Sequence, residues 1–339
     1  MFIKFQMGKI VNYFSHFLLH PCTFAGYIYC MSVIVSVEHL HKEFNGVKAV
    51  NDLSFTVHEG DVYGFLGQNG AGKSTSIRMM LTLVKPDSGS IRIFDKELAH
   101  HRNEILSQTG AIIERPDLYK YLSAYDNLSI FARLSGVKTS RKLLMDQLEK
   151  VGLADRHDSK VKTFSQGMKQ RLGIAVALVH NPKLIILDEP TNGLDPQGIA
   201  DMRRLIIELS SEHGKTVIVS SHLLSEIEMM ANRMIVINKG KKIAEGSVSE
   251  MLDPAATIVQ LETTNDEATK ILLLESAWAP SLEASPAIRF RMNKNDIPRL
   301  AAWLIEKQVG IISLQPKHSL EDYFLSLTNP ENHVEPVSN

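Results

Sequence analysis

The residues with the clearest chemistry form a glycine-rich stretch, 67–75, which fits the pattern G-x-x-x-x-G-K-[ST] at every fixed position. In such a loop the glycines let backbone N–H groups turn toward phosphates, Lys73 can reach the β and γ oxygens, and the Ser74 hydroxyl can bind Mg²⁺. The apolar run 61–66 before the loop predicts a buried strand, and residues 76–81 after it predict a helix. This context favours a nucleoside triphosphate site over a structural glycine turn.

A pair of carboxylates, Asp188 and Glu189, closes the apolar run 184–187. That run predicts a strand buried on both faces, and open α/β sheets bind ligands at the carboxyl ends of such strands. We expect Asp188 to hold Mg²⁺ directly or through water, and Glu189 to orient and deprotonate an attacking water. Solvated acids at an exposed strand end are the alternative, and the phosphate loop makes it the weaker one.

A second anion site is predicted where Ser165 and Gly167 precede the helix-forming run 172–178. A hydroxyl, free N–H groups and the helix dipole together attract phosphate, although an isolated serine here would be an ordinary N-cap. In company with the phosphate loop and the acidic pair, this stretch resembles the signature motif of the ATP-binding cassette (ABC) family. The resemblance covers roughly residues 32–246.

The resemblance implies a role for each further motif position. Phe44 would stack on adenine, Asp195 would lie in the loop that contacts a second copy, and His222 would be the switch histidine near the γ-phosphate. It also implies that Ser74 and Asp188 bind the metal ion and that Lys73, Glu189 and His222 act in catalysis. The residues that would bind ATP between two copies are Phe44, Gly67, Asn69, Gly70, Ala71, Gly72, Lys73, Ser74, Thr75, Glu114, Ser165, Gly167 and Asp195.

Two positions depart from the family pattern. The usual Leu-Ser-Gly-Gly-Gln reads Phe-Ser-Gln-Gly-Met at 164–168, which keeps the two residues that would touch phosphate. Glu114 stands where most members carry a glutamine that senses Mg²⁺ and communicates with the membrane subunit. Together with the stretches 118–128 and 319–328, Glu114 makes the chain similar to the ATPases of bacitracin and lantibiotic exporters.

The composition is that of an ordinary globular protein of more than one domain. The 339 residues carry 37 basic and 38 acidic side chains, so there is no basic excess typical of a nucleic-acid binder. The two cysteines lie near the N-terminus, which fits a reducing compartment. Residues 10–37 carry no Asp, Glu, Lys or Arg, but polar residues and Pro21 interrupt them, so an upstream extension of the reading frame is favoured over a membrane anchor.

The alternation of apolar runs predicts an α/β fold. Strands at 33–37 and 53–57 would form an antiparallel edge layer, strands at 184–187 and 217–220 a parallel core, and helices within 124–153 an inserted α-helical subdomain. Strands at 257–261, 287–292 and 310–314 and a helix at 320–325 predict a small α+β appendage. The expected divisions are an N-terminal extension at 1–30, an ABC-type P-loop NTPase domain at 31–250, an accessory domain at 251–328 and a disordered tail at 329–339.

The resemblance implies an ATPase that powers export through a separate transmembrane permease. Two copies would form a dimer on the cytoplasmic face of the membrane, with no nucleic acid bound. A cassette ATPase that acts on DNA or ribosomes is the alternative, yet repair-type members carry long coiled-coil or zinc insertions and the translation factors carry two cassettes. A module that binds ATP without hydrolysing it is disfavoured by Glu189.

Overall fold

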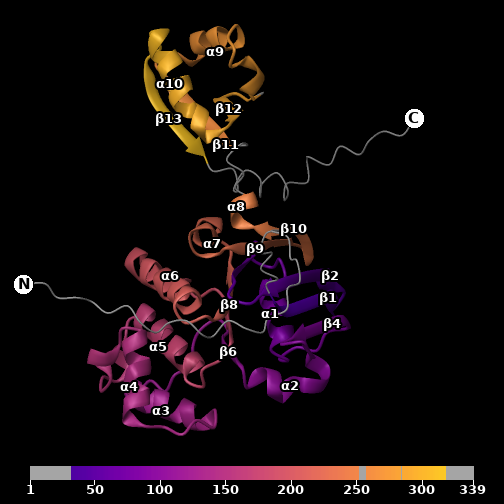
Figure 1. The fold of residues 1–339 in the computed structure, drawn as a ribbon, viewed down its shortest axis with the longest axis vertical. Helices are drawn as coiled ribbons and strands as arrows, with labels where there is room; N and C mark the ends of the chain where they lie inside the picture. Colours follow the sequence, from indigo (N-terminus) through magenta and orange to yellow (C-terminus); the bar gives the residue numbers. More distant parts are fainter. Residues whose placement is uncertain (1–31, 252–256, 284, 318–339) are drawn as a thin grey trace, which may run out of the picture. The chain divides into compact units, whose positions relative to one another are not determined.

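The computed structural model describes residues 32–251, 257–283 and 285–317. They form three β-sheets with flanking helices (Figure 1). The α/β core, the antiparallel layer, the inserted helices and the α+β appendage are all present, so the predicted fold class is confirmed. The expectations for 1–30, for a helix at 320–325 and for the tail at 329–339 lie outside the described residues.

The central sheet has six strands in the order β10-β9-β3-β8-β7-β6. Neighbouring strands are parallel except for β10, which is antiparallel to β9. Because the carboxyl ends of parallel strands meet at one edge, the loops after β3, β6, β7 and β8 are brought together there. The bounds are β3 Val62–Leu66, β6 Thr109–Ile112, β7 Leu184–Leu187, β8 Thr216–Ser221, β9 Arg233–Asn238 and β10 Lys241–Ser247.

Both faces of this sheet are buried, which explains its uninterrupted apolar runs. In β3, Val62 and Leu66 belong to one core, whereas Tyr63 and Phe65 belong to the core on the other face. Alternation along the strand therefore feeds two separate cores. The strands are held from both sides, so the loops at their ends start from fixed points.

One of these cores is closed by a four-stranded antiparallel sheet in the order β2-β1-β4-β5. The two long strands are joined at Asn45 and Gly46, which have φ values of 49° and 84°, and residues 59–61 lead from β2 into β3. The predicted strands at 33–37 and 53–57 are parts of this longer hairpin. The bounds are β1 Val33–Phe44, β2 Val47–His58, β4 Ser88–Ile93 and β5 Lys96–Glu97.

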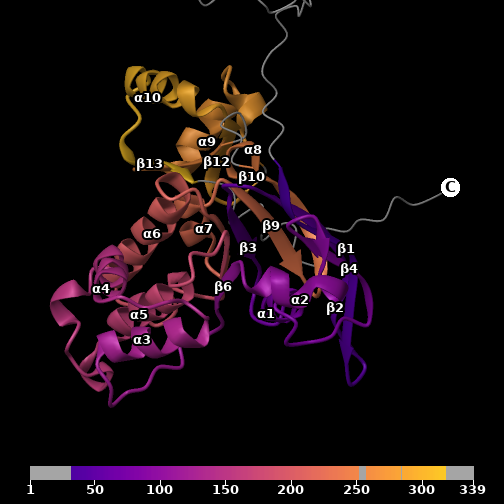
Figure 2. The ribbon, with the colours of Figure 1, turned by 60° about the horizontal axis from the view of Figure 1, so that its bottom comes forward.

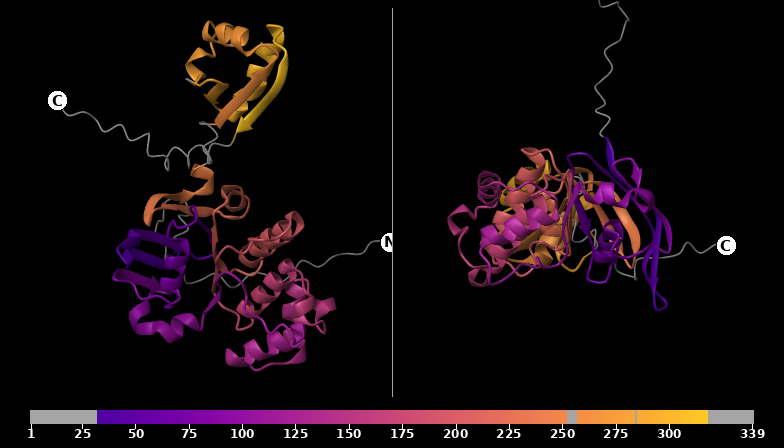
Figure 3. Two further views of the ribbon diagram at one scale, coloured as in Figure 1. Left: turned by 180° about the vertical axis from the view of Figure 1, so that it is seen from behind. Right: turned by 90° about the horizontal axis from the view of Figure 1, so that it is seen from below.

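Helices cover the two faces unequally. Seen from behind (Figure 3, left), the indigo strands β1 and β2 and the magenta helices α3 and α4 lie on opposite sides of the central sheet, and Figure 2 shows the same separation. The predicted helical stretch 124–153 contains two helices. Gly136, with a φ of 72°, lies in the break between them, and Ser140 caps the second helix. The bounds are α1 Lys73–Met80, α2 Leu98–Leu106, α3 Ala124–Leu134, α4 Arg141–Lys150, α5 Gln166–Leu178, α6 Pro196–Ser211, α7 Leu224–Met230 and α8 Val248–Met251.

The C-terminal part is a three-stranded antiparallel sheet with two helices and its own core. Phe290, Leu300 and Leu304 are fully buried in it. The elements are β11 Thr257–Thr263, α9 Asp266–Leu274, β12 Ile288–Met292, α10 Ile297–Glu306 and β13 Ile311–Lys317. Throughout the described ranges, every helix is too short or too polar to cross a bilayer.

Candidate nucleotide-binding and catalytic site

The phosphate loop links β3 to α1 and passes so close to other backbone that side chains have no room. A Cβ on Gly72, whose φ is 107°, would lie 2.5 Å from the carbonyl oxygen of Ala49. A Cβ on Gly67 would lie 2.6 Å from the carbonyl oxygen of Ile237. These two glycines are therefore required by packing as well as by phosphate binding.

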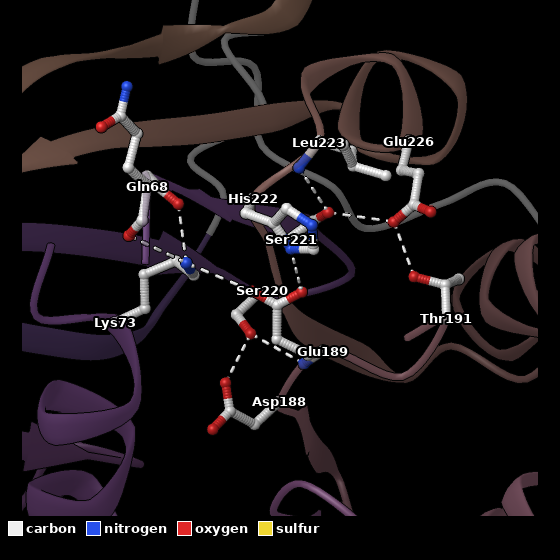
Figure 4. Close-up of polar contacts among 11 residues, drawn as sticks. Gln68, Lys73, Asp188, Glu189, Thr191, Ser220, Ser221, His222, Leu223 and Glu226 are labelled. Atoms are coloured by element: carbon white, nitrogen blue, oxygen red, sulfur yellow. Dashed lines mark hydrogen bonds and ion pairs between the residues drawn. The ribbon is translucent and has the colours of Figure 1, made fainter. Parts of the chain in front are cut away.

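Lys73 begins α1, and its ammonium group is buried at the mouth of the loop. Nζ donates to the carbonyl oxygens of Gly67 at 2.6 Å and Gln68 at 3.3 Å (Figure 4). The helix adds its positive N-terminal dipole at the same place, and the first turn has no acidic residue to offset it. The loop therefore presents a fixed positive end to an anion.

Asp188 follows β7 and is 1% exposed. Its Oδ1 accepts a hydrogen bond from the Ser220 hydroxyl at 2.6 Å, while Oδ2 is buried without a hydrogen-bond partner. A buried carboxylate oxygen left unpaired is costly, because it has lost its water. This oxygen is thus available to a cation.

Glu189 lies between two basic groups. Its backbone has a φ of 50° and its N–H donates to Ser220 Oγ at 2.9 Å, which fixes the start of the side chain. Its Oε2 is 2.8 Å from His222 Nδ1. Its Oε1 is 3.2 Å from Lys73 Nζ, an ion pair in which that oxygen receives no well-aligned hydrogen bond. The structure therefore brings together the side chains of Lys73, Glu189 and His222.

A cavity of about 380 Å³ lies beside these groups, lined by Ser74, Ile113, Glu114, Arg115, Asp188, Glu189 and Asn192. Among the described residues no group of three or more His, Cys, Asp or Glu side chains is arranged to hold a metal ion by itself. Ser74 and the unpaired Asp188 Oδ2 offer two oxygens, so a divalent cation fits here only if phosphate or water completes its shell. That is the usual way in which Mg²⁺ is held.

Glu114 lies in the loop after β6, with a φ of 60°. It lines the same cavity and forms an ion pair with Arg78 of α1. The carboxylate that replaces the family's usual glutamine is therefore neutralised within the chain. Arg78 is a residue that no motif had indicated, because only the fold brings α1 to this loop.

Of the predicted site residues, Ser74, Glu114, Asp188 and Glu189 line this cavity, whereas Phe44, Ser165, Gly167 and Asp195 belong to other elements and lie outside its lining. Phe44 ends β1 and is 45% exposed, with Lys42 Nζ 5.1 Å from the centre of its ring. Ser165 caps α5 by accepting from the N–H of Met168 at 3.2 Å, and Gly167 follows in the first turn of that helix. Asp195 caps α6 by accepting from the N–H of Gly198 at 3.2 Å. Their local geometry fits an exposed stacking ring and two helix N-termini.

Several polar residues of the site have no signal in the sequence. Ser220 holds both Asp188 and Glu189, and Glu226 of α7 accepts hydrogen bonds from Thr191 and Ser221. Three of these four contacts join residues 31 to 35 positions apart, between the segment that follows β7 and residues of β8 or α7. A single sequence does not show such pairs.

Comparison with known proteins gives a consistent result. The family model for the ABC transporter matches residues 50–192. An uncharacterized ABC transporter ATP-binding protein of Bacillus subtilis, YhcH, is 42% identical over 88% of this chain and 97% of its own length. The bacitracin transport ATP-binding protein BcrA of Bacillus licheniformis is 39% identical over 88% and 98%. The lantibiotic transport ATP-binding protein SrtF of Streptococcus pyogenes is 45% identical over 62% and 90%.

Solved structures agree with the fold. An ATP-binding subunit of an ABC transporter has a TM-score of 0.58 at 30% identity, covering 64% of this chain and 91% of its own. A dimeric ATP-binding cassette in a post-hydrolysis state with ADP and phosphate has a TM-score of 0.57 at 25% identity, covering 63% and 99%. The similarity to bacitracin and lantibiotic proteins is confirmed as well. The chain belongs to the ABC transporter family and is an ATP-binding subunit of that family.

Proposed function

We propose that this chain hydrolyses ATP to power the export of a peptide antibiotic, a lantibiotic or a related drug through a separate transmembrane permease. The observation that carries the proposal is the Lys73, Glu189 and His222 cluster beside a cavity lined by Ser74 and Asp188. The substrate class rests on similarity to BcrA over almost the whole of that protein and to SrtF. No observation favours a DNA-repair or ribosomal partner.

Binding is assigned to the phosphate loop and its surroundings. Backbone N–H groups of 67–75 and Lys73 hold the phosphates, and Phe44 stacks on the adenine. Ser74 and Asp188 hold Mg²⁺, which neutralises charge on the transferred phosphoryl group. The unpaired Asp188 Oδ2 supports this assignment, because a cation relieves the cost of its burial.

Hydrolysis is assigned to Glu189, which orients a water molecule and takes its proton on a carboxylate oxygen. His222 keeps the carboxylate in place through Nδ1 and stabilises the γ-phosphate region. With nucleotide bound, the Lys73 ammonium turns from the Gly67 and Gln68 carbonyls toward phosphate oxygens. Glu189 then loses its close contact with Lys73 and is free to act on water.

Each complete site needs two copies of the chain. Ser165 and Gly167 lie at the N-terminus of α5, outside the cavity that holds Asp188, so we assign them to the ATP bound by the partner chain. Asp195 is assigned to the contact between copies. The domain limits at 31–250 and 251–328, with flanking segments 1–30 and 329–339, remain part of this proposal, as does a peripheral position on the cytoplasmic face of the membrane.

The test is co-purification and reconstitution. The chain should be isolated from its native membranes in mild detergent with a bound permease, and the complex should hydrolyse ATP faster when bacitracin or a lantibiotic is added. Lys73→Ala and Asp188→Asn should abolish hydrolysis, since each removes charge that the triphosphate and Mg²⁺ need. Wild-type turnover in either variant would contradict the site, whereas stimulation absent with every peptide would contradict only the substrate class.

A further inference from the structure

The carboxylate of Glu226 is buried beside the proposed catalytic centre, although none of the motifs includes it. Glu226 belongs to α7 and is 6% exposed. Its Oε2 accepts hydrogen bonds from Thr191 Oγ1 at 2.6 Å and from Ser221 Oγ at 2.9 Å (Figure 4). A buried carboxylate persists only where hydrogen bonds replace its water, so these two bonds fix the side chain.

The two hydroxyls belong to two different segments of the site. Thr191 comes two residues after Glu189, in the segment that follows β7, and Ser221 directly precedes His222 at the end of β8. The Ser221 hydroxyl also accepts from the N–H of Leu223 at 2.9 Å. Glu226 therefore ties together the two segments whose side chains meet in the contact between Glu189 and His222.

Through Thr191, Glu226 is also connected to the segment that leads to Asp195, which is assigned to the contact between copies. The N–H of Asn192 donates to the carbonyl oxygen of Glu189 at 3.1 Å, and the N–H of Leu194 donates to that of Thr191 at 3.2 Å. These two turns lead from Glu189 toward Asp195. A shift at Thr191 would thus move both the base and the start of the dimer-contacting loop.

We propose that Glu226 is a positioning residue for ATP hydrolysis. Through Thr191 and Ser221 it keeps the side chains of Glu189 and His222 in contact with each other. The inference rests on the proposed function and deepens it. Glu226 accepts hydrogen bonds from Thr191 and Ser221, neither of which is assigned to phosphate or Mg²⁺, so its loss should misplace the base while leaving nucleotide binding intact. The expected signature is a fall in kcat with little change in nucleotide affinity.

The test compares Glu226→Ala, Glu226→Gln, Thr191→Val and the double variant Glu226→Ala/Thr191→Val. Glu226→Ala should lower kcat by about tenfold or more, as loss of a positioning hydrogen bond commonly does. Glu226→Gln should retain part of the rate, because its amide oxygen can still accept a hydroxyl proton. If Glu226→Ala and Thr191→Val lower kcat by breaking the same hydrogen bond, the double variant should be no slower than Glu226→Ala alone.

Glu212→Gln is the matched control, because this carboxylate is exposed at the end of α6 and should leave kcat unchanged. Nucleotide affinity and melting temperature are measured on every variant. A lower melting temperature with unchanged kcat, or nucleotide affinity falling in step with kcat, would assign Glu226 a purely structural role and overturn the inference. Additive losses in the double variant would also overturn it. If the proposed function is wrong, the wild-type chain will not hydrolyse ATP, and this result is distinguishable from failure of the inference about Glu226.

Discussion

Glu189 is the residue on which the basic groups of the site converge. One of its oxygens is paired with His222 and the other lies near Lys73, so the free site is held partly by charges that nucleotide binding must rearrange. In the proposed mechanism, phosphate oxygens replace Glu189 as the partners of the Lys73 ammonium group, which offsets the loss of that contact. In the proposed mechanism, Glu189 therefore has two roles: it holds Lys73 and His222 together before nucleotide binds, and it acts as the base once ATP is bound.

Glu189→Gln should slow hydrolysis by about 10²- to 10⁴-fold, because an amide cannot take a proton from water. Nucleotide affinity should be retained, since the amide keeps the shape and removes a negative charge near the γ-phosphate. Single-turnover hydrolysis and equilibrium nucleotide binding measure the two effects separately. A variant that hydrolyses at the wild-type rate would show that another group is the base.

The sequence was sufficient for residues that act through local pattern. The phosphate loop, the acidic pair after an apolar run and the serine at a helix start each depend on neighbours along the chain, so they could be predicted. Arg78, Ser220 and Glu226 act through partners on other elements, and nothing along the chain marks them. Their roles needed the register of β7 against β8 and the placement of α1 and α7.

At the scale of elements, the position of α5 matters because its N-terminus carries the signature residues. The helix packs against β6 so tightly that a Cβ on Gly110 would lie 2.3 Å from the carbonyl oxygen of Ala177. A Cβ on Gly173 would lie 2.6 Å from Cβ of Pro116, in the loop that carries Glu114. Strands and helices could be predicted from apolar periodicity, but these close approaches could not.

Gly110→Ala should destabilise the chain by about 1–3 kcal/mol, because the added methyl group collides with backbone that cannot turn aside. The matched control is Gly246→Ala in β10, the opposite edge strand of the same sheet, where the nearest atoms are side-chain atoms at 3.6 Å. Chemical unfolding followed by circular dichroism measures both. Equal stability of the two variants would contradict the tight packing of α5.

The link from α5 to β7 contains a group that makes stability depend on pH. Burial lowers the pKa of His180, whose Nε2 lies 3.2 Å from the carbonyl oxygen of Thr109. In the unfolded chain the imidazole regains its ordinary pKa of about 6.5 and binds protons that the folded chain excludes. Its contribution to stability is therefore present above that pH and is lost as the pH falls below it.

His180→Asn should reduce the difference between the unfolding free energies measured at pH about 7.5 and about 5.5, because one proton-linked group has been removed. Denaturant titration of both proteins at each pH provides the four values needed. Other histidines contribute equally to both proteins and cancel in the comparison. An unchanged pH dependence would show that His180 titrates alike in the folded and unfolded chain.

At the scale of the whole molecule, the proposed mechanism gives one chain two phosphate-binding surfaces of different kinds. The first is the loop with Lys73, and the second is the N-terminus of α5 with Ser165. The family to which the chain belongs includes a cassette solved as a dimer with ADP and phosphate. In the proposed mechanism, ATP completes a site that two copies of the chain share.

The shared site is tested by the molar mass of Glu189→Gln, measured by size exclusion with light scattering in the absence and in the presence of Mg²⁺-ATP. The slow variant should elute as a monomer alone and as a dimer with ATP, since the nucleotide is retained and bridges the copies. Adding Ser165→Arg should abolish the dimer while ATP binding to the loop persists. A monomer at saturating ATP, or a dimer that is indifferent to Ser165→Arg, would contradict the shared site.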